Sequence, residues 1–170
     1  ESEISKLFDF DERDTWHTKY GKKALPFSFV MDLNTINKLD KFTYIPRSDG
    51  GNGTLIKGTV EYSVDKNKWL PAGSFNWKRD NTIKTFDFSS HPSVRYIKIS
   101  VEMASGNYGS GQELYVFKVA GTASILPGDI NDDHKIDNND LTSYMNYTGL
   151  RKGDADFDGY ISKGDINKNG

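Results

Sequence analysis

Between residues 27 and 119 the sequence consists of short apolar or alternating runs, each ended by a cluster of turn-forming residues. The expected strands cover 27–33, 39–45, 56–63, 82–88, 94–101 and 114–119. The intervening stretches SDGGNG, VDKNKW and SGNYGSG are rich in Gly, Asn and Asp, which favour turns. Several short strands at this spacing predict an antiparallel sandwich or barrel, and the helical crossovers that a parallel sheet needs are missing.

Aromatic residues support a β-rich core, because they make up 13% of the chain, with 10 Phe, 9 Tyr and 3 Trp. Trp16 and Trp69 each follow a turn and enter an apolar region, so both are expected in the core, whereas Trp77 is left unassigned. A helical bundle is therefore not expected.

Three function classes find no support in the composition. The chain has no cysteine, which excludes disulfides and thiolate metal sites. No apolar run approaches the roughly 18 residues of a membrane span, and the charged start at Glu1 does not suit a signal peptide. A formal net charge of −2 without a basic stripe predicts no nucleic-acid partner.

Both ends are interpreted as the boundaries of a piece of a longer protein.

A change in composition divides the chain. The stretch 121–127 has no charge and ends in proline, and Asp dominates after it. We therefore expect a sandwich over 1–121, a linker over 122–127 and an acidic tail over 128–170.

The tail contains two copies of a twelve-residue pattern with oxygen-bearing side chains at alternate positions. An extended loop turns every second side chain toward one point, which suits Ca²⁺ and its six to eight oxygen ligands. The expected ligands of the first loop are Asp129, Asn131, Asp133, Lys135 through its carbonyl, Asp137 and Asp140. Those of the second are Asp154, Asp156, Asp158, Tyr160 through its carbonyl, Ser162 and Asp165. The alternative, a solvated acidic linker, predicts neither the repeat nor the apolar eighth positions Ile136 and Ile161, which are expected to pair.

The loops resemble those of dockerins, tandem EF-hand-like modules whose helices bind cohesin domains in assemblies of secreted glycosidases. Asp140 and Asp165 stand at position 12, where dockerins have Asp and EF-hands have Glu. His134 departs from the usual glycine at position 6, and a further loop frame begins at Asp165 without being completed. The resemblance implies a truncated calcium-binding segment. Its dockerin pair is either the two loops above or the loop at 129 with the unfinished frame at 165, in which case the 154–165 loop is an extra. Within the segment, Leu141, Tyr144 and Met145 are spaced as one side of a short helix over 138–148.

The preceding module resembles the discoidin or F5/8 type C family, known in secreted glycosidases as carbohydrate-binding module family 32. The resemblance covers about residues 4–119 and rests on the order of FDFDERDTWHT, PFSFVMDL, YIPR, VDKNKW, VRYIKI and QELYVF. It implies an antiparallel jelly-roll β-sandwich with a structural calcium and a sugar site on its end loops. The implied calcium ligands are the carbonyls of Lys6, Asp11 and Gln112 and the side chains of Asp9, Asp14 and Glu113. A solvated acidic turn is the alternative for the DxDxxD run.

The same resemblance implies the residues that contact sugar. These are His17 of the WHT motif, Tyr20 three residues later, Arg47 at the end of YIPR, and the loop residues Asn52 and Tyr108. Each residue alone also fits an ordinary surface or loop role, so only their convergence predicts a site.

The favoured function is a non-catalytic carbohydrate-binding module that holds a secreted glycoside hydrolase near galactose-, GalNAc- or GlcNAc-type glycans, outside the cell, in the periplasm or at the cell surface. The alternative is a structural or interaction module whose tail docks a cohesin or its own sandwich. Catalysis is not expected, since the carboxylates stand at metal-loop spacing instead of as an isolated pair.

Overall fold

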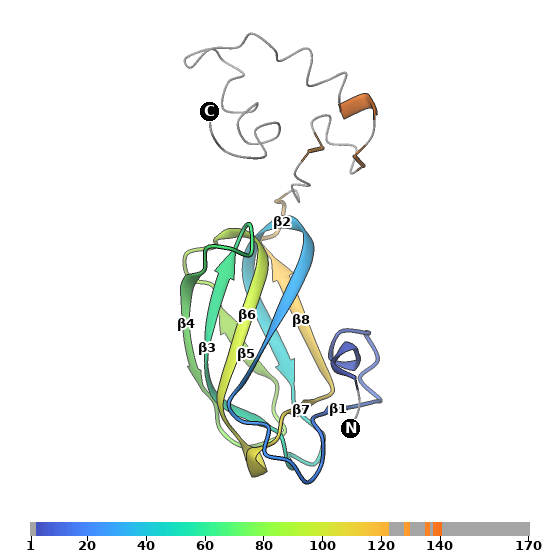
Figure 1. Cartoon of the computed structure of the whole chain (residues 1–170), viewed down its shortest axis with the longest axis vertical. Coiled ribbons are helices and arrows are strands. Elements are labelled where there is room, and N and C mark those ends of the chain that lie inside the picture. The colour runs from blue at the N-terminus through green and yellow to red at the C-terminus, as the bar shows by residue number, and fades with distance from the viewer. Residues whose placement is uncertain (1–2, 123–127, 130–134, 137, 141–170) are drawn as a thin grey trace.

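A computed structural model of the protein describes residues 3–122, 128–129, 135–136 and 138–140. Two antiparallel β layers form a sandwich (Figure 1), as the resemblance implied. The elements are η1 (Ile4–Leu7), β1 (Trp16–His17), β2 (Phe27–Ile45), β3 (Leu55–Ser63), β4 (Leu70–Asn76), β5 (Lys84–Asp87), β6 (Ser93–Ala104), η2 (Ser105–Asn107), β7 (Ser110–Gly111) and β8 (Glu113–Lys118).

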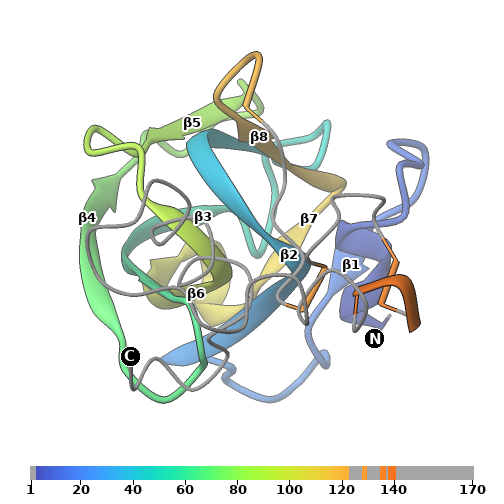
Figure 2. The same ribbon diagram turned by 90° about the horizontal axis from the view of Figure 1, so that it is seen from above.

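The long strand β2 belongs to both layers. Its first part pairs with β6, from Phe27↔Val101 to Asp32↔Tyr96, and completes the layer β4-β3-β6-β2. After a register shift between Asp32 and Asn37, its second part pairs with β5 and β8. Figure 2 looks down onto the two layers that β2 joins. The separate strands expected over 27–33 and 39–45 are therefore one continuous strand that bends from one sheet to the other.

Three strands were not expected from the sequence. The segment LPAGSFN of β4 lacks alternation because it buries only Phe75, with its other residues exposed or half-buried. The short pair β1 and β7 joins Trp16↔Gly111 and His17↔Ser110 across the chain, and no local pattern marks it. The other strands lie within a few residues of their expected ranges.

The core is built from aromatic rings and β-branched side chains between the layers. Phe42 stacks on Phe86 with ring centroids 5.2 Å apart, and Trp77 stacks on Phe75 at 4.0 Å. Burial of one such ring contributes roughly 1.5–3 kcal/mol. Trp16 is 4% exposed, which confirms its expected core position. The core assignment of Trp69 is wrong: the side chain is half-buried on the sheet exterior, with the Lys98 ammonium 4.7 Å from its ring centroid.

The described residues of the tail include the start of the expected helix, because 138–140 are helical. Ile136 is 63% exposed. Its expected partner Ile161 lies outside the described residues, so their pairing stays a prediction.

Among the helices in the described part of the chain, none is long and apolar enough to cross a membrane.

Candidate functional site

The loops 18–26, 46–54 and 105–109 meet at the end of the sandwich that also carries β1 and β7, the lower end in Figure 1. Backbone hydrogen bonds tie these loops to one another. The Thr18 amide donates to the Gly109 carbonyl at 2.8 Å, the Ala24 amide to Asn107 at 3.0 Å, and the Gly53 amide to Ser105 at 2.7 Å. These ties make the loops a joint surface at one pole of the molecule.

Three of the predicted sugar-site residues form a ring cluster, defined here as His17, Tyr20 and Tyr108. Buried His17 stacks on Tyr20 with centroids 4.0 Å apart and planes 12° apart, while Tyr20 is 59% exposed. The Tyr108 ring lies 5.4 Å from His17 and 6.0 Å from Tyr20. The buried imidazole therefore supports an exposed tyrosine, which suits stacking on the apolar side of a sugar ring.

The two other predicted residues, Arg47 and Asn52, lie in the 46–54 loop. The Arg47 guanidinium donates to the Asp49 carboxylate at 2.9 Å, and Asp49 also accepts the Gly51 amide hydrogen at 2.9 Å. A Cβ added at Gly106, which has φ +67°, would lie 2.6 Å from Asn52 Oδ1. Asn52 therefore packs against the loop that leads to Tyr108, whereas Arg47 is held by its ion pair with Asp49.

Three supporting residues were not identified from the sequence: Asp49, Tyr44 and Asn81. Tyr44 is buried under the site, where its hydroxyl donates to the Ser110 carbonyl at 2.5 Å and accepts the Leu55 amide hydrogen at 3.3 Å. Burial raises the pKa of Tyr44, so the hydroxyl stays protonated. The Asn81 amide donates to the Ser48 carbonyl at 2.9 Å and steadies the Arg47 loop. The Asp-Gly-Gly turn signal could have indicated Asp49, but these long-range contacts have no local signature.

A second polar cluster surrounds Glu113, the first residue of β8. Its buried carboxylate accepts the amide hydrogens of Leu114, at 3.0 Å, and of Phe10. One oxygen, Oε2, has no hydrogen-bond partner. Burial raises the pKa of Glu113, and the charges of Asp9 and Glu12 raise it further. A cation would satisfy this carboxylate, since a buried charge without a partner is costly.

Four of the other predicted ligands, Lys6, Asp9, Asp11 and Asp14, lie in the N-terminal segment before β1, and Gln112 directly precedes Glu113. Asp14 has one buried oxygen, Oδ1, without a hydrogen-bond partner, while its Oδ2 accepts the Lys6 ammonium at 2.7 Å. The Asp11 carboxylate binds Arg13, whose hydrogen bonds lower the pKa of Asp11 to about 2, leaving only the Asp11 carbonyl as the expected donor. The Gln112 amide donates to the Glu12 carbonyl.

The buried carboxylate oxygens Glu113 Oε2 and Asp14 Oδ1, which have no hydrogen-bond partner, are of the type that calcium binds. Among the described residues, no three His, Cys, Asp or Glu side chains group tightly enough to hold a metal ion by themselves.

The tail ligands are described only in part. Asp129 and Asp140, at positions 1 and 12 of the first loop, are 2% and 4% exposed, whereas Lys135 is exposed. Their roles as calcium ligands stay a prediction. The remaining expected ligands, namely Asn131, Asp133, Asp137, Asp154, Asp156, Asp158, Tyr160, Ser162 and Asp165, lie outside the described residues.

The fold and the pole of interlocked loops define a class of protein: an antiparallel β-sandwich with a candidate ligand site on the loops at one end. Residues 1–114 match the profile of the F5/8 type C domain. The chain belongs to this family.

The curated relatives are much longer proteins. A galactose oxidase of Gibberella zeae is 30% identical over 134 residues, which are 75% of this chain and 20% of the oxidase. An A type blood N-acetyl-α-D-galactosamine deacetylase of Flavonifractor plautii is 29% identical over 69% of this chain and 15% of its own length. The chain thus spans about one fifth or less of the length of these relatives.

Solved structures of Clostridium perfringens share the fold. A family 32 module in complex with GalNAc-β-1,3-galactose is 31% identical, with a TM-score of 0.62, over 69% of this chain and 84% of that module. The family 32 module of NanJ, in complex with galactose, is 29% identical, with a TM-score of 0.61, over 66% of this chain and 82% of that module.

Proposed function

We propose that the sandwich is a non-catalytic carbohydrate-binding module whose ring cluster holds a galactose-, GalNAc- or GlcNAc-type sugar. The observation that carries this proposal is the exposed Tyr20 ring stacked on buried His17 beside Tyr108. In this proposal the apolar side of a pyranose stacks on Tyr20 or Tyr108, and its hydroxyls hydrogen-bond to the Arg47 and Asn52 side chains. Family 32 modules solved with galactose and with GalNAc-β-1,3-galactose support this choice of sugars.

The site is suited to weak and reversible binding. It offers two exposed or half-exposed rings and few charged groups, so we expect dissociation constants of about micromolar to millimolar. Such affinity suffices when the module is tethered, since it raises the effective concentration of glycan near a linked enzyme. The parent protein is then a secreted glycoside hydrolase, and the module works outside the cell, in the periplasm or at the cell surface.

Calcium has a structural role in this proposal. In the sandwich, the cation would be held by the Glu113, Asp14 and Asp9 carboxylates together with carbonyls of Lys6, Asp11 and Gln112, and it would neutralise the buried charge at the start of β8. In the tail, the 129–140 and 154–165 loops would each bind one ion. The buried Asp129 and Asp140 support the first of these sites.

A glycan array followed by calorimetry with galactose tests the sugar site. The variant His17→Ala/Arg47→Ala is expected to lose binding. The control Tyr96→Ala removes a half-buried ring that contacts Lys66 and Arg95, and it is expected to bind as the unmodified chain does. Retention of binding by the double variant would show that the ring cluster is not the sugar site. The alternative function, docking of a cohesin by the tail, predicts instead a cohesin complex that forms equally well with the double variant.

A further inference from the structure

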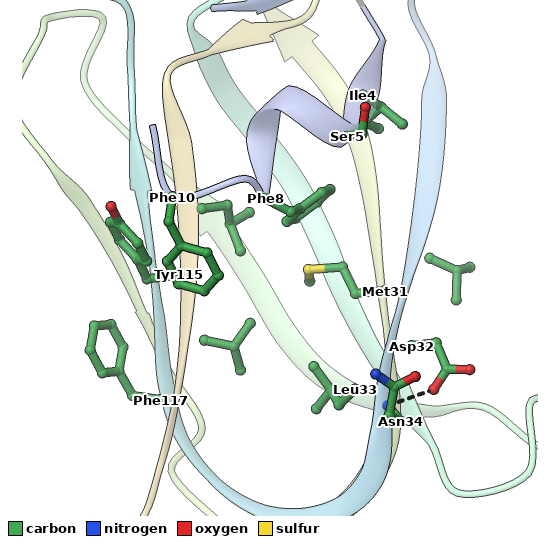
Figure 3. A pocket seen from close by; sticks show the side chains of 13 residues that line it. Ile4, Ser5, Phe8, Phe10, Met31, Asp32, Leu33, Asn34, Tyr115 and Phe117 are labelled. Atoms are coloured by element: carbon green, nitrogen blue, oxygen red, sulfur yellow. Dashed lines mark hydrogen bonds between the residues drawn. The ribbon is translucent and has the colours of Figure 1, made fainter. Parts of the chain in front are cut away.

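The two sheets separate along one side of the sandwich and leave an apolar groove of about 770 Å³ (Figure 3). One wall is the first part of β2, which pairs with β6 alone, and the other is β8, which pairs with β2 alone, among the strands that the structure describes. The N-terminal segment with η1 closes the gap only in part. Ten of the thirteen residues that line the groove are apolar or aromatic. None of the lining residues belongs to the ring cluster.

Large apolar side chains are exposed around the groove. Phe10 is 81% exposed, and Ile4, Val30 and Phe117 are each about 40% exposed. Phe10 has a φ of +63°, a conformation rare for a non-glycine residue, and its ring lies 5.7 Å from that of Tyr115. A contiguous apolar surface of this kind is typical of an interaction site.

The chemistry of the groove selects a protein segment over a glycan. Its rings do not form a flat platform, because Phe10 and Tyr115 are tilted by 39°, and Tyr115 and Phe117 by 56°. Its one charged lining residue, Asp32, already accepts two hydrogen bonds from Arg95, at 2.7 and 2.9 Å. The groove therefore offers burial of apolar side chains and few directed polar contacts.

We propose that this groove is the docking site for the chain's own C-terminal segment, with Leu141, Tyr144 and Met145 packed into it from one side of a helix. The helix begins within the described residues, since 138–140 are helical, and the three apolar residues follow at helical spacing. An amphipathic helix of this length is marginal alone in water and needs an apolar surface to pack against.

The place where the chain leaves the sandwich favours this occupant. The last strand ends at Lys118, one residue after Phe117, and Figure 3 shows Phe117, Leu33 and Asn34 at one end of the groove, with Ile4 and Ser5 at the other. Residues 119–128 alone can span up to about 33 Å when extended. The tail therefore starts at one end of the groove and is long enough to return to it.

Charge is complementary at the same place. The tail from residue 128 holds nine Asp and no Glu against five Lys or Arg, whereas the rest of the chain holds more basic than acidic residues. Lys38, Lys41 and Lys118 belong to the strands from which the tail departs, and the Lys41 ammonium lies 5.7 Å from the Phe117 ring centroid. An acidic tail is thereby attracted to the groove end, while its apolar helix face supplies the contact.

Disulfide trapping tests the proposal directly, because the full chain has no cysteine of its own. In the full chain with calcium present, Val30→Cys/Met145→Cys is expected to form an intramolecular disulfide under mild oxidation. The matched control Ser74→Cys/Met145→Cys places the first cysteine on exposed β4 and is expected to stay reduced. Equal trapping in both pairs, trapping in neither, or disulfide-linked dimers from the Val30 pair would each overturn the proposal.

Hydrogen exchange supplies a second measurement that does not depend on cysteine geometry. Val30→Asp is expected to raise amide exchange over 139–148 at least tenfold, whereas Ser28→Asp, on the same exposed face of β2, leaves it unchanged. Exchange over 139–148 that does not respond to Val30→Asp would refute docking. Galactose binding is measured in both variants, and because the groove and the ring cluster share no residue, loss of the sugar site and loss of docking are separate results.

Discussion

Replacement of Glu113 by glutamine tests two expected effects of its buried carboxylate: stabilisation of the fold when calcium is bound, and destabilisation by a buried charge when calcium is absent. The substitution keeps the shape of the side chain and removes the charge that would bind calcium. At a calcium concentration one hundred times the dissociation constant, binding stabilises a folded protein by about 2.7 kcal/mol. For a domain of this size the expected rise in melting temperature is roughly 10 °C. Glu113→Gln is expected to lose most of this rise.

Without calcium, Glu113→Gln is expected to increase the stability of the folded chain. Because the pKa of Glu113 is raised in the folded state, its protonation favours folding. The stabilisation that protonated Glu113 gives is fully present below its unfolded-state pKa of about 4.3. It is lost as the pH rises through the raised pKa of Glu113 in the folded state. In EDTA at neutral pH, Glu113→Gln is therefore expected to be more stable than the unmodified chain, and the difference is expected to vanish on acidification.

Tryptophan fluorescence is the appropriate assay, since Trp16, Trp69 and Trp77 all lie in the sandwich and report its unfolding without interference from the tail. Glu12→Gln, an exposed neighbour, serves as the matched control and is expected to keep the full calcium response. An equal calcium-dependent rise in melting temperature for Glu113→Gln and the unmodified chain would refute the assignment of Glu113 as a ligand.

Four further predictions concern the core, the pole and the tail. Tyr44→Phe leaves the Ser110 carbonyl and the Leu55 amide without their partner, so urea unfolding is expected to show a loss of about 1–3 kcal/mol. Tyr20→Ala is expected to weaken galactose binding about threefold to tenfold in calorimetry, the equivalent of a lost stacking contact, with an unchanged melting temperature. Phe75→Ala removes a buried ring that stacks on Trp77, and the free energy of unfolding is expected to fall by about 3–5 kcal/mol. Asp129→Ala is expected to reduce the number of calcium ions bound in a titration by one, and an unchanged number would contradict the first loop.

The strands that alternate in the sequence were predictable because each buries one face. The β2 strand was divided in two because the residues of its bend, Asn34 to Asn37, have the composition of a turn, although the backbone continues through them into the second sheet. The β4 strand was missed because it buries only one residue, so its sequence shows no alternation of apolar and polar residues. Trp69 was misplaced because following a turn does not determine which side of a sheet a ring occupies, and a cation above the ring holds it outside.

The ring cluster was predicted only through motif resemblance, since no local pattern brings His17 next to Tyr108. Their contact depends on the pairing of β1 with β7, which joins segments about ninety residues apart. Asp49 and Tyr44 were absent from the predicted site for the same reason: one acts by holding Arg47, the other by fixing the backbone of Ser110 from below. Residues that act through others are visible only once the tertiary contacts are known.

The opposite placement of the ring cluster and the chain exit determines how the module carries a mechanical load. If a glycan holds the pole at Tyr20 while the rest of the protein pulls on the chain beyond Lys118, the force runs along β8 from Glu113 to Lys118. The ladder between β8 and β2, from Ile45↔Glu113 to Leu39↔Lys118, is then loaded in shear, so that its hydrogen bonds must break together and not one after another. If the proposed sugar binding is weak, the sugar would detach before this ladder breaks, and the sandwich would remain folded under tension.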